Sequence, residues 1–107
     1  MLLLTPTSLL LATLPLVAPQ RCSSTISQRC DALCLDSGFT GVAKCSSKME
    51  GGIKSSSCTC ANVAGGGNCL TFGMNCRDAC VAEFGLYQYD NSGNCTAFAA
   101  TCDCIQV

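Results

Sequence analysis

Twelve of the 107 residues are cysteines, and their spacing repeats along the chain. Each half carries a lone cysteine, a CxxxC pair, a second lone cysteine and a final CxC pair. The first set is Cys22, Cys30, Cys34, Cys45, Cys58 and Cys60, and the second is Cys69, Cys76, Cys80, Cys95, Cys102 and Cys104. Such self-similarity indicates two copies of one small structural unit.

The first 20 residues are interpreted as a signal peptide. Residues 1–18 carry no charge, are dominated by leucine and end in small residues, a pattern typical of a secretory leader. The run is shorter and more interrupted by Pro, Thr and Ser than a membrane span of about 20 apolar residues. We therefore expect a secreted, extracellular protein without a transmembrane anchor after cleavage, where disulfides persist. A retained anchor is the alternative.

The two short cysteine spacings have a geometric explanation. Residues i and i+4 of a helix lie on the same face, about 6 Å apart along the helix axis. Residues i and i+2 of a strand also lie on the same face, about 6.7 Å apart. A CxxxC helix on a CxC strand can therefore form two parallel disulfides, while the lone cysteines tie the N-terminal segment to another strand. The predicted pairs are Cys22–Cys45, Cys30–Cys58, Cys34–Cys60, Cys69–Cys95, Cys76–Cys102 and Cys80–Cys104.

Local signals place a helix over each CxxxC pair. Residues 25–28, Thr-Ile-Ser-Gln, fit a capping box that opens the first helix, and Gly38 suits its C-terminal end. In the second half, Asn75 is positioned to cap a helix whose cysteine face extends to Phe84, and Gly85 ends it.

Turn signals place a hairpin after each helix. Residues 50–53, Glu-Gly-Gly-Ile, lie between two Ser- and Lys-rich runs and predict a hairpin turn. Residues 90–93, Asp-Asn-Ser-Gly, predict a turn into a strand at Cys95, and the six residues before Cys102 predict a tight hairpin.

The expected fold is a small disulfide-rich α+β protein. It consists of two tandem modules, residues 21–61 and 69–107, each with one helix on a small antiparallel sheet, joined by a flexible Gly-rich linker at 62–68. Each module has only about 40 residues, near the size at which a hydrophobic core alone fails. Three disulfides, at roughly 2–4 kcal/mol each, supply the missing stability. We expect two small cores that fold independently.

Charge and composition exclude several function classes. The net charge of −1 is too balanced for a nucleic-acid binder. Without histidine, a Ser-His-Asp triad and histidine metal sites are impossible, and no histidine can activate a catalytic cysteine. Thiolates could bind zinc or copper(I), but a leader and an even cysteine count favour disulfides. We expect a monomeric protein that is not an enzyme and holds no metal or cofactor.

The charge is unevenly distributed. Residues 21–61 hold five basic and three acidic residues, a net charge of +2, whereas residues 69–107 hold one basic and four acidic residues, a net charge of −3. The two halves are therefore expected to present different surfaces to a partner.

Three stretches resemble the cysteine-stabilised αβ (CSαβ) defensins of invertebrates and fungi. They are the run from Cys30-Asp-Ala-Leu-Cys34 to Cys45 with Cys58-Thr-Cys60, the second half from Cys76 to Cys104, and Gly93-Asn-Cys95, which matches the Gly-x-Cys element of that family. The likeness spans residues 22–104 and implies a knottin-like fold with the same disulfide connectivity. The tandem arrangement and leader also look like a small secreted cysteine-rich protein of a fungus.

Two features depart from that family. The first half has Ala43-Lys-Cys45 where Gly-x-Cys is expected, so its hairpin is expected to begin differently. The chain is also not cationic, whereas membrane-active members generally are, which argues against direct permeabilisation of a membrane.

The first hairpin offers candidate contact residues. Lys44, Lys48 and Lys54 flank Met49 and Ile53. They predict a cationic, amphipathic surface for anionic lipid or a channel mouth. The alternative is a solvated hairpin whose lysines protect an exposed edge strand.

The second half offers aromatic candidates and a modification site. Phe98 lies close to a hairpin tip, and Tyr87 and Tyr89 lie on the preceding long loop. These rings could anchor a partner or simply cover the helix. Asn94-Cys-Thr96 is a formal N-glycosylation sequon.

Three functions fit these observations. The first, favoured by the local basic charge and the resemblance, is a secreted defensin-like antimicrobial or toxin that binds an envelope component of competing microbes. The second, favoured by the net acidity, is a host-directed fungal effector that binds a host protein as a protease inhibitor or immune suppressor. The third is a structural, wall-associated protein.

Overall fold

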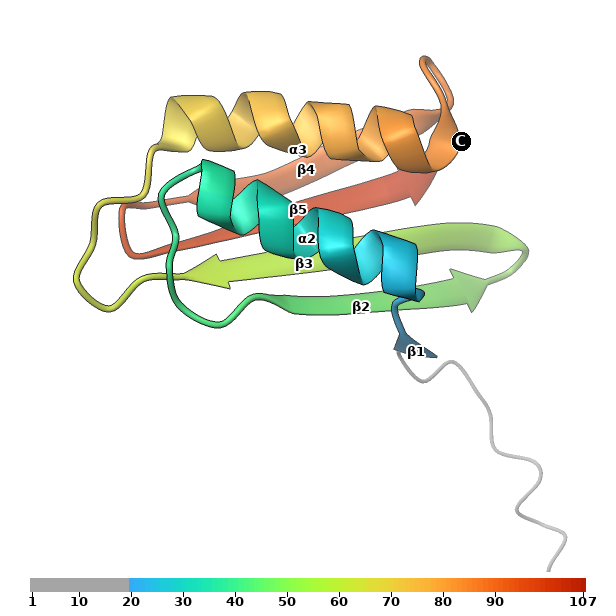
Figure 1. The fold of residues 1–107 in the computed structure, drawn as a ribbon. Helices are drawn as coiled ribbons and strands as arrows, with labels where there is room; N and C mark the ends of the chain where they lie inside the picture. The colour runs from blue at the N-terminus through green and yellow to red at the C-terminus, as the bar shows by residue number, and fades with distance from the viewer. Residues whose placement is uncertain (1–19) are drawn as a thin grey trace, which may run out of the picture.

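The computed structural model describes residues 20–107, which place two helices on one face of a single antiparallel sheet (Figure 1). Apart from Gln20, the predicted leader lies outside the described residues. The elements in chain order are β1 (Gln20–Arg21), α2 (Ser24–Asp36), β2 (Lys44–Glu50), β3 (Ile53–Ala61), α3 (Cys69–Phe84), β4 (Tyr89–Cys95) and β5 (Ala99–Gln106). The strand order across the sheet is β1-β2-β3-β5-β4. Within residues 20–107, neither helix is long and apolar enough to cross a membrane.

Helix α2 begins earlier than the sequence predicts. Ser23 is its N-cap, and the Ser23 side chain accepts a hydrogen bond from the backbone N–H of Ile26. The capping box expected at residues 25–28 is therefore wrong, because these residues already lie inside the helix. The C-terminal end is as expected: Gly38 has a φ of +88°, and the N–H groups of Gly38 and Phe39 bond back to carbonyls of the last turn.

Helix α3 also begins earlier than predicted. Its N-cap is Asn68, which accepts a hydrogen bond from the N–H of Thr71 at 3.0 Å. The predicted cap, Asn75, lies inside the helix, and its side-chain amide donates to the Ser37 hydroxyl at 3.1 Å. The prediction is wrong because the helix extends back to Cys69, ahead of the CxxxC pair. Gly85 ends the helix as predicted.

Both predicted hairpins form, but one predicted turn does not. Gly51 and Gly52 connect β2 to β3 with φ values of +60° and +80°, as a two-residue hairpin turn requires. Residues 96–98 connect β4 to β5. Residues 90–93 lie within β4 instead of forming a turn. The Gly in that stretch, Gly93, is needed because a Cβ there would overlap the carbonyl oxygen of Thr101.

The two halves share one sheet and one core. Strand β3 of the first half pairs with β5 of the second from Ser55↔Ile105 to Ala61↔Ala99. Helix α2 packs on α3, and the rings of Phe39 and Phe72 meet edge to face with centroids 5.8 Å apart. Buried residues from both halves form one cluster. The expectation of two independent cores is therefore wrong, because the inner edges of both hairpins pair with each other and remove two exposed strand edges.

The Gly-rich connection is packed against both halves, since the N–H of Asn62 donates to the carbonyl of Phe98 at 2.8 Å in addition to its contacts with the first half. It runs from residue 62 to 68, the predicted bounds, but it is not a free flexible linker. Asn62 is buried, and its side-chain amide donates to the carbonyl of Gly38 at 2.9 Å. The N–H of Asn68 donates to the carbonyl of Ser37 at 2.8 Å. At Gly67, a Cβ would overlap the ring of Phe39, so close packing explains this glycine.

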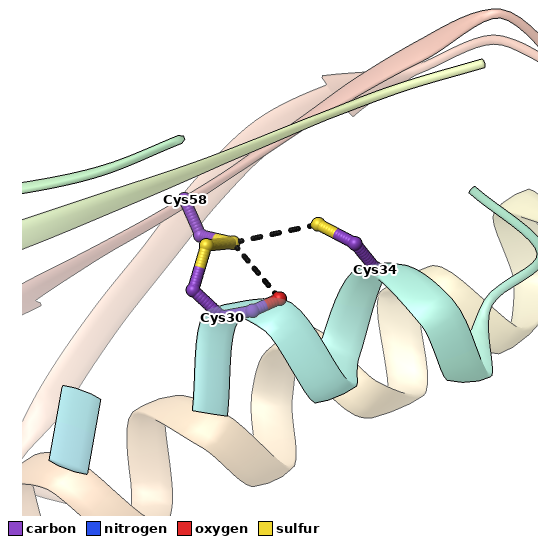
Figure 2. A group of neighbouring side chains, drawn as sticks. All are labelled: Cys30, Cys34 and Cys58. Carbon is purple, nitrogen blue, oxygen red and sulfur yellow. Dashed lines mark hydrogen bonds between the residues drawn. A yellow bond between two sulfur atoms is a disulfide. The ribbon is translucent and has the colours of Figure 1, made fainter. Parts of the chain in front are cut away.

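Six disulfides join the helices and the N-terminal segment to the strands. The pairs are Cys22–Cys45, Cys30–Cys58, Cys34–Cys60, Cys69–Cys95, Cys76–Cys102 and Cys80–Cys104, the same six that the spacing predicts. Their Cα–Cα distances of 5.4–5.8 Å are ordinary for this bond. Figure 2 shows how tightly the bridges pack: the Sγ of Cys58, bonded to Cys30, lies 3.7 Å from the Sγ of Cys34. The structure is thus a small disulfide-rich α+β fold.

Candidate binding surfaces

Both helices cover one face of the sheet, and within residues 20–107 no helix or strand covers the other face (Figure 1). The CxC cysteines of β3 and β5 are buried on the helix side. Because side chains alternate along a strand, the residues between them point the other way. This open face comprises Arg21, Lys44, Ser46, Lys48, Glu50, Ile53, Ser55, Ser57, Thr59, Asp90, Ser92, Asn94, Thr101, Asp103 and Ile105.

Hydroxyl groups dominate the centre of the open face. Ser46 lies opposite Ser57 across β2 and β3, and Thr59 lies opposite Thr101 across β3 and β5. A shallow groove of about 360 Å³ runs over these strands, with Ser46, Lys48, Ser55, Ser57, Ser92, Asp103 and Ile105 among its lining residues. The surface can therefore donate and accept many hydrogen bonds without large side chains that must reorder.

Charges on the open face are separated by strand except for one acid, Glu50, which lies on β2 beside the cations. The cations Arg21, Lys44 and Lys48 lie on β1 and β2, whereas Asp90 and Asp103 lie on β4 and β5. Within residues 21–107 the one ion pair joins Lys48 Nζ to a Glu50 oxygen at 3.7 Å, with the two side chains 49% and 62% exposed. Such an exposed pair is weak, so Lys48 remains available to a ligand.

The structure divides the candidates of the first hairpin between two faces. Lys44, Lys48 and Ile53 belong to the open face, whereas Met49 and Lys54 lie opposite each other on the helix side. Met49 and Ile53 are 54% and 52% exposed. Because the lysines and the apolar side chains are divided in this way, the hairpin does not form the single cationic, amphipathic surface expected from the sequence.

The aromatic candidates are also divided. Tyr87 and Tyr89 line one hollow between α3 and β4. Phe98 lies at the other end of the strands, in the β4–β5 turn, where its ring approaches Gly65. Tyr89 is half-buried against the core, which agrees with the alternative that the aromatic rings cover the helix.

The sequon residue Asn94 is exposed on the open face of β4, the edge strand. In the following turn, the Thr96 hydroxyl accepts hydrogen bonds from the N–H groups of Phe98 and Ala99, both at 3.2 Å. The sequon thus spans the end of a strand and a tight turn.

Sequence reasoning missed most of the open face and the helical side of the hollow. The alternation of Ser or Thr with Cys at residues 55–60 is a strand signal that could have revealed the hydroxyl-rich face. Arg77 and Val81, one helical turn apart, share a face of α3 and both line the hollow. The spacing of Arg77 and Val81 can be seen in the sequence, but the sequence does not show that α3 packs beside β4.

Two groups of sulfur atoms have the spacing of metal ligands. Those of Cys30, Cys34 and Cys58 lie within 4.8 Å of one another, and the second half repeats the group with Cys76, Cys80 and Cys102. Every one of these sulfurs belongs to a disulfide, whereas the thiolate is the form that binds a metal. The groups therefore serve as covalent links between helix and sheet.

Comparison with known proteins assigns no family: no protein-family model, curated protein or solved structure matches the chain.

Proposed function

We propose that this chain is a secreted, defensin-like antimicrobial protein that binds an anionic component of a microbial envelope, and is not an enzyme. One observation carries the proposal: Arg21, Lys44 and Lys48 lie on adjacent strands of an open, hydroxyl-rich face. A guanidinium group binds phosphate or carboxylate oxygens in a bidentate manner, and an ammonium group adds a point charge. Neighbouring hydroxyls can bond the remaining oxygens of a phosphate-bearing wall polymer or wall precursor.

The proposed fold relationship is a tandem CSαβ arrangement. In each half, a CxxxC helix is linked by two disulfides to a CxC strand. This repeated linkage supports the interpretation of residues 21–61 and 69–107 as two copies of one module that have joined their sheets. Gly93 supports it further, because it occupies a position of close backbone approach in the second hairpin.

Binding at the surface, not membrane permeabilisation, is the proposed mode of action. The net charge is −1, and the exposed Met49 lies on the face opposite Lys44 and Lys48. Insertion into a membrane surface needs cations and a large apolar area around one element. The open face instead suits a polar polymer, and the six disulfides limit the conformational freedom lost on binding.

The test uses the oxidised, secreted chain and purified bacterial cell walls that carry teichoic acid. Replacing Lys44 and Lys48 together by Ala should weaken wall binding at least tenfold and weaken growth inhibition at micromolar concentrations in parallel. The matched control is Lys54→Ala, which also removes a lysine from the same hairpin but from the opposite face. Equal loss in both variants, or no growth inhibition across a broad panel of bacteria and fungi, contradicts the proposal.

A second candidate function is a host-directed effector that binds a host protein. The acidic side of the open face favours it, because Asp90 and Asp103 flank the 42%-exposed Ile105. This side could dock against a basic surface with an apolar centre. Capture of one host protein that is lost with Asp103→Ser but retained with Lys44→Ala would favour the effector over the antimicrobial protein.

A further inference from the structure

A second surface lies on the other side of β4. A hollow of about 680 Å³ runs between α3, the α3–β4 loop and β4, and α3 packs beside β4 in the fold (Figure 1). We name it the tyrosine groove; its lining residues are Arg77, Asp78, Val81, Leu86, Tyr87, Tyr89, Asp90 and Asn91. Its volume falls within the roughly 300–1,000 Å³ typical of ligand sites.

Tyr87 is held in an unfavourable backbone conformation. Its φ of +66° makes it the one residue other than glycine with a positive φ within the described part of the chain. For a bulky residue, such a conformation costs on the order of 1–3 kcal/mol and persists only where the surroundings enforce it. Here both ends of the loop are tied: the N–H of Gly85 donates to Val81 at 2.8 Å, and the carbonyl of Gln88 accepts from Val107 at 3.1 Å.

The strained residue adds little to the core. Tyr87 is 83% exposed, and its neighbour Leu86 is 59% exposed. The half-buried Tyr89 lines the same groove. An exposed aromatic side chain that is held at an energetic cost, beside a second tyrosine, points to contact with a ligand and not to packing.

The polar side chains of the groove comprise one cation, Arg77, two carboxylates, Asp78 and Asp90, and the amide of Asn91, and they have spare hydrogen-bonding capacity. Arg77 and Asp78 are exposed, and neither forms an ion pair within residues 21–107. Asn91 donates its amide to the Sγ of Cys76 at 3.7 Å, which leaves its side-chain oxygen free to accept. Asp90 belongs to the open face by register and contributes at the rim. The edge strand β4 adds backbone groups that have no strand partner on that side among residues 20–107.

We propose that the tyrosine groove binds a neutral carbohydrate chain. A sugar ring presents a C–H face, against which an aromatic ring packs, and a rim of hydroxyls, which planar amide, carboxylate and guanidinium groups can bond. An anionic ligand would meet two carboxylates, Asp78 and Asp90, against the single cation Arg77. A purely apolar segment would bury Arg77 and Asp78 without partners, which is costly. The proposal goes beyond the proposed function, because it uses a different surface and different residues.

The experiment measures retention of the oxidised, secreted chain on three insoluble polysaccharides: chitin, β-1,3-glucan and cellulose. The affinity for the matching soluble hexasaccharide is then measured by calorimetry. We expect binding to one of the three that persists in 0.5 M NaCl, because the ligand is neutral. Tyr87→Gly should lower the affinity at least tenfold while preserving the fold, since glycine adopts a positive φ without strain.

Two controls separate this site from a general loss of structure and from the open face. Leu35→Ala removes an apolar side chain of α2 that is 61% exposed, and it should leave retention unchanged. The Lys44→Ala, Lys48→Ala double variant should also bind the polysaccharide normally. The inference is overturned by no retention on any of the three polymers, by retention lost in salt, or by full retention of Tyr87→Gly. Preferential capture of a cationic peptide would likewise assign the groove to a different ligand.

Discussion

Phe39 and Phe72 provide a direct test that the two halves of this protein share one core. Phe39 follows the helix of the first half, and Phe72 lies on the helix of the second. The two side chains are 0% and 4% exposed, and their ring planes meet at 71° with centroids 5.8 Å apart. We therefore expect Phe39→Leu and Phe72→Leu to interact energetically, although the residues belong to different repeats.

The magnitudes follow from burial and geometry. Truncation of a buried Phe to Ala costs about 3–5 kcal/mol, and Leu keeps much of the buried volume, so each single variant should lose about 1–2 kcal/mol. An edge-to-face pair contributes about 0.5–1.5 kcal/mol beyond its buried area. The double variant should therefore be less destabilised than the sum of the single variants by about that amount.

The assay is guanidinium unfolding of the wild type, both single variants and the double variant, with all disulfides intact. Leu70→Ala is the control partner for Phe39→Leu: Leu70 is on the same helix as Phe72 but is 78% exposed, so these two effects should add. Additivity of Phe39→Leu and Phe72→Leu within about 0.5 kcal/mol, or two separate unfolding transitions, would refute the shared core.

Two further predictions concern particular contacts. Gly93→Ala should destabilise the fold by about 1–3 kcal/mol, because the added Cβ would overlap the Thr101 carbonyl. Gly73→Ala, on an open stretch of α3, should instead stabilise the fold by about 0.5–1 kcal/mol. Thermal melts that show the same sign for both variants would contradict this account. Ser56 donates to a Glu83 oxygen at 2.6 Å across the two halves, so Ser56→Ala should cost about 1–3 kcal/mol. Adding Glu83→Leu to Ser56→Ala should recover most of that loss in guanidinium titrations, and a neutral Ser56→Ala would show that this bond is not stabilising.

The disulfide pairing could be predicted from the sequence because it depends on spacings of only two and four residues within one strand or one helix. Residues i and i+4 of a helix and i and i+2 of a strand share a face wherever those elements occur. Each CxxxC and CxC pair therefore faces its partner once the helix lies on the strand. The Gly51-Gly52 turn was equally readable, since a two-residue hairpin needs positive φ at both positions.

The helix starts were predicted less well, because several polar residues could cap each helix. Thr25 and Asn75 have suitable side chains, but Ser23 and Asn68 are the caps. The chain before each CxxxC pair had room for a longer helix, and the sequence did not show which polar residue would begin it. Cys69 lies inside α3, whereas Cys22 precedes α2 and follows β1.

The candidate surfaces depended most on tertiary structure. Sequence alone assigned Lys44, Lys48 and Lys54 to one basic hairpin, but strand alternation in the observed register places Lys54 on the other face. Tyr87 and Tyr89 were identified as aromatic candidates, but the groove also needs Arg77 and Asp78 from a helix that packs beside β4.

The amino-acid sequence by itself determined the covalent framework, the number of helices and the β2–β3 turn, because these follow from spacings within a few residues and from the backbone freedom of glycine. Only the tertiary structure decided that β3 pairs with β5, that Phe39 meets Phe72 and that both helices of the described residues lie on the same face of the sheet. The physical reason is that any unpaired strand edge offers the same N–H and C=O groups. Which edges pair depends on how the helices and the 62–68 connection pack together, not on any local pattern.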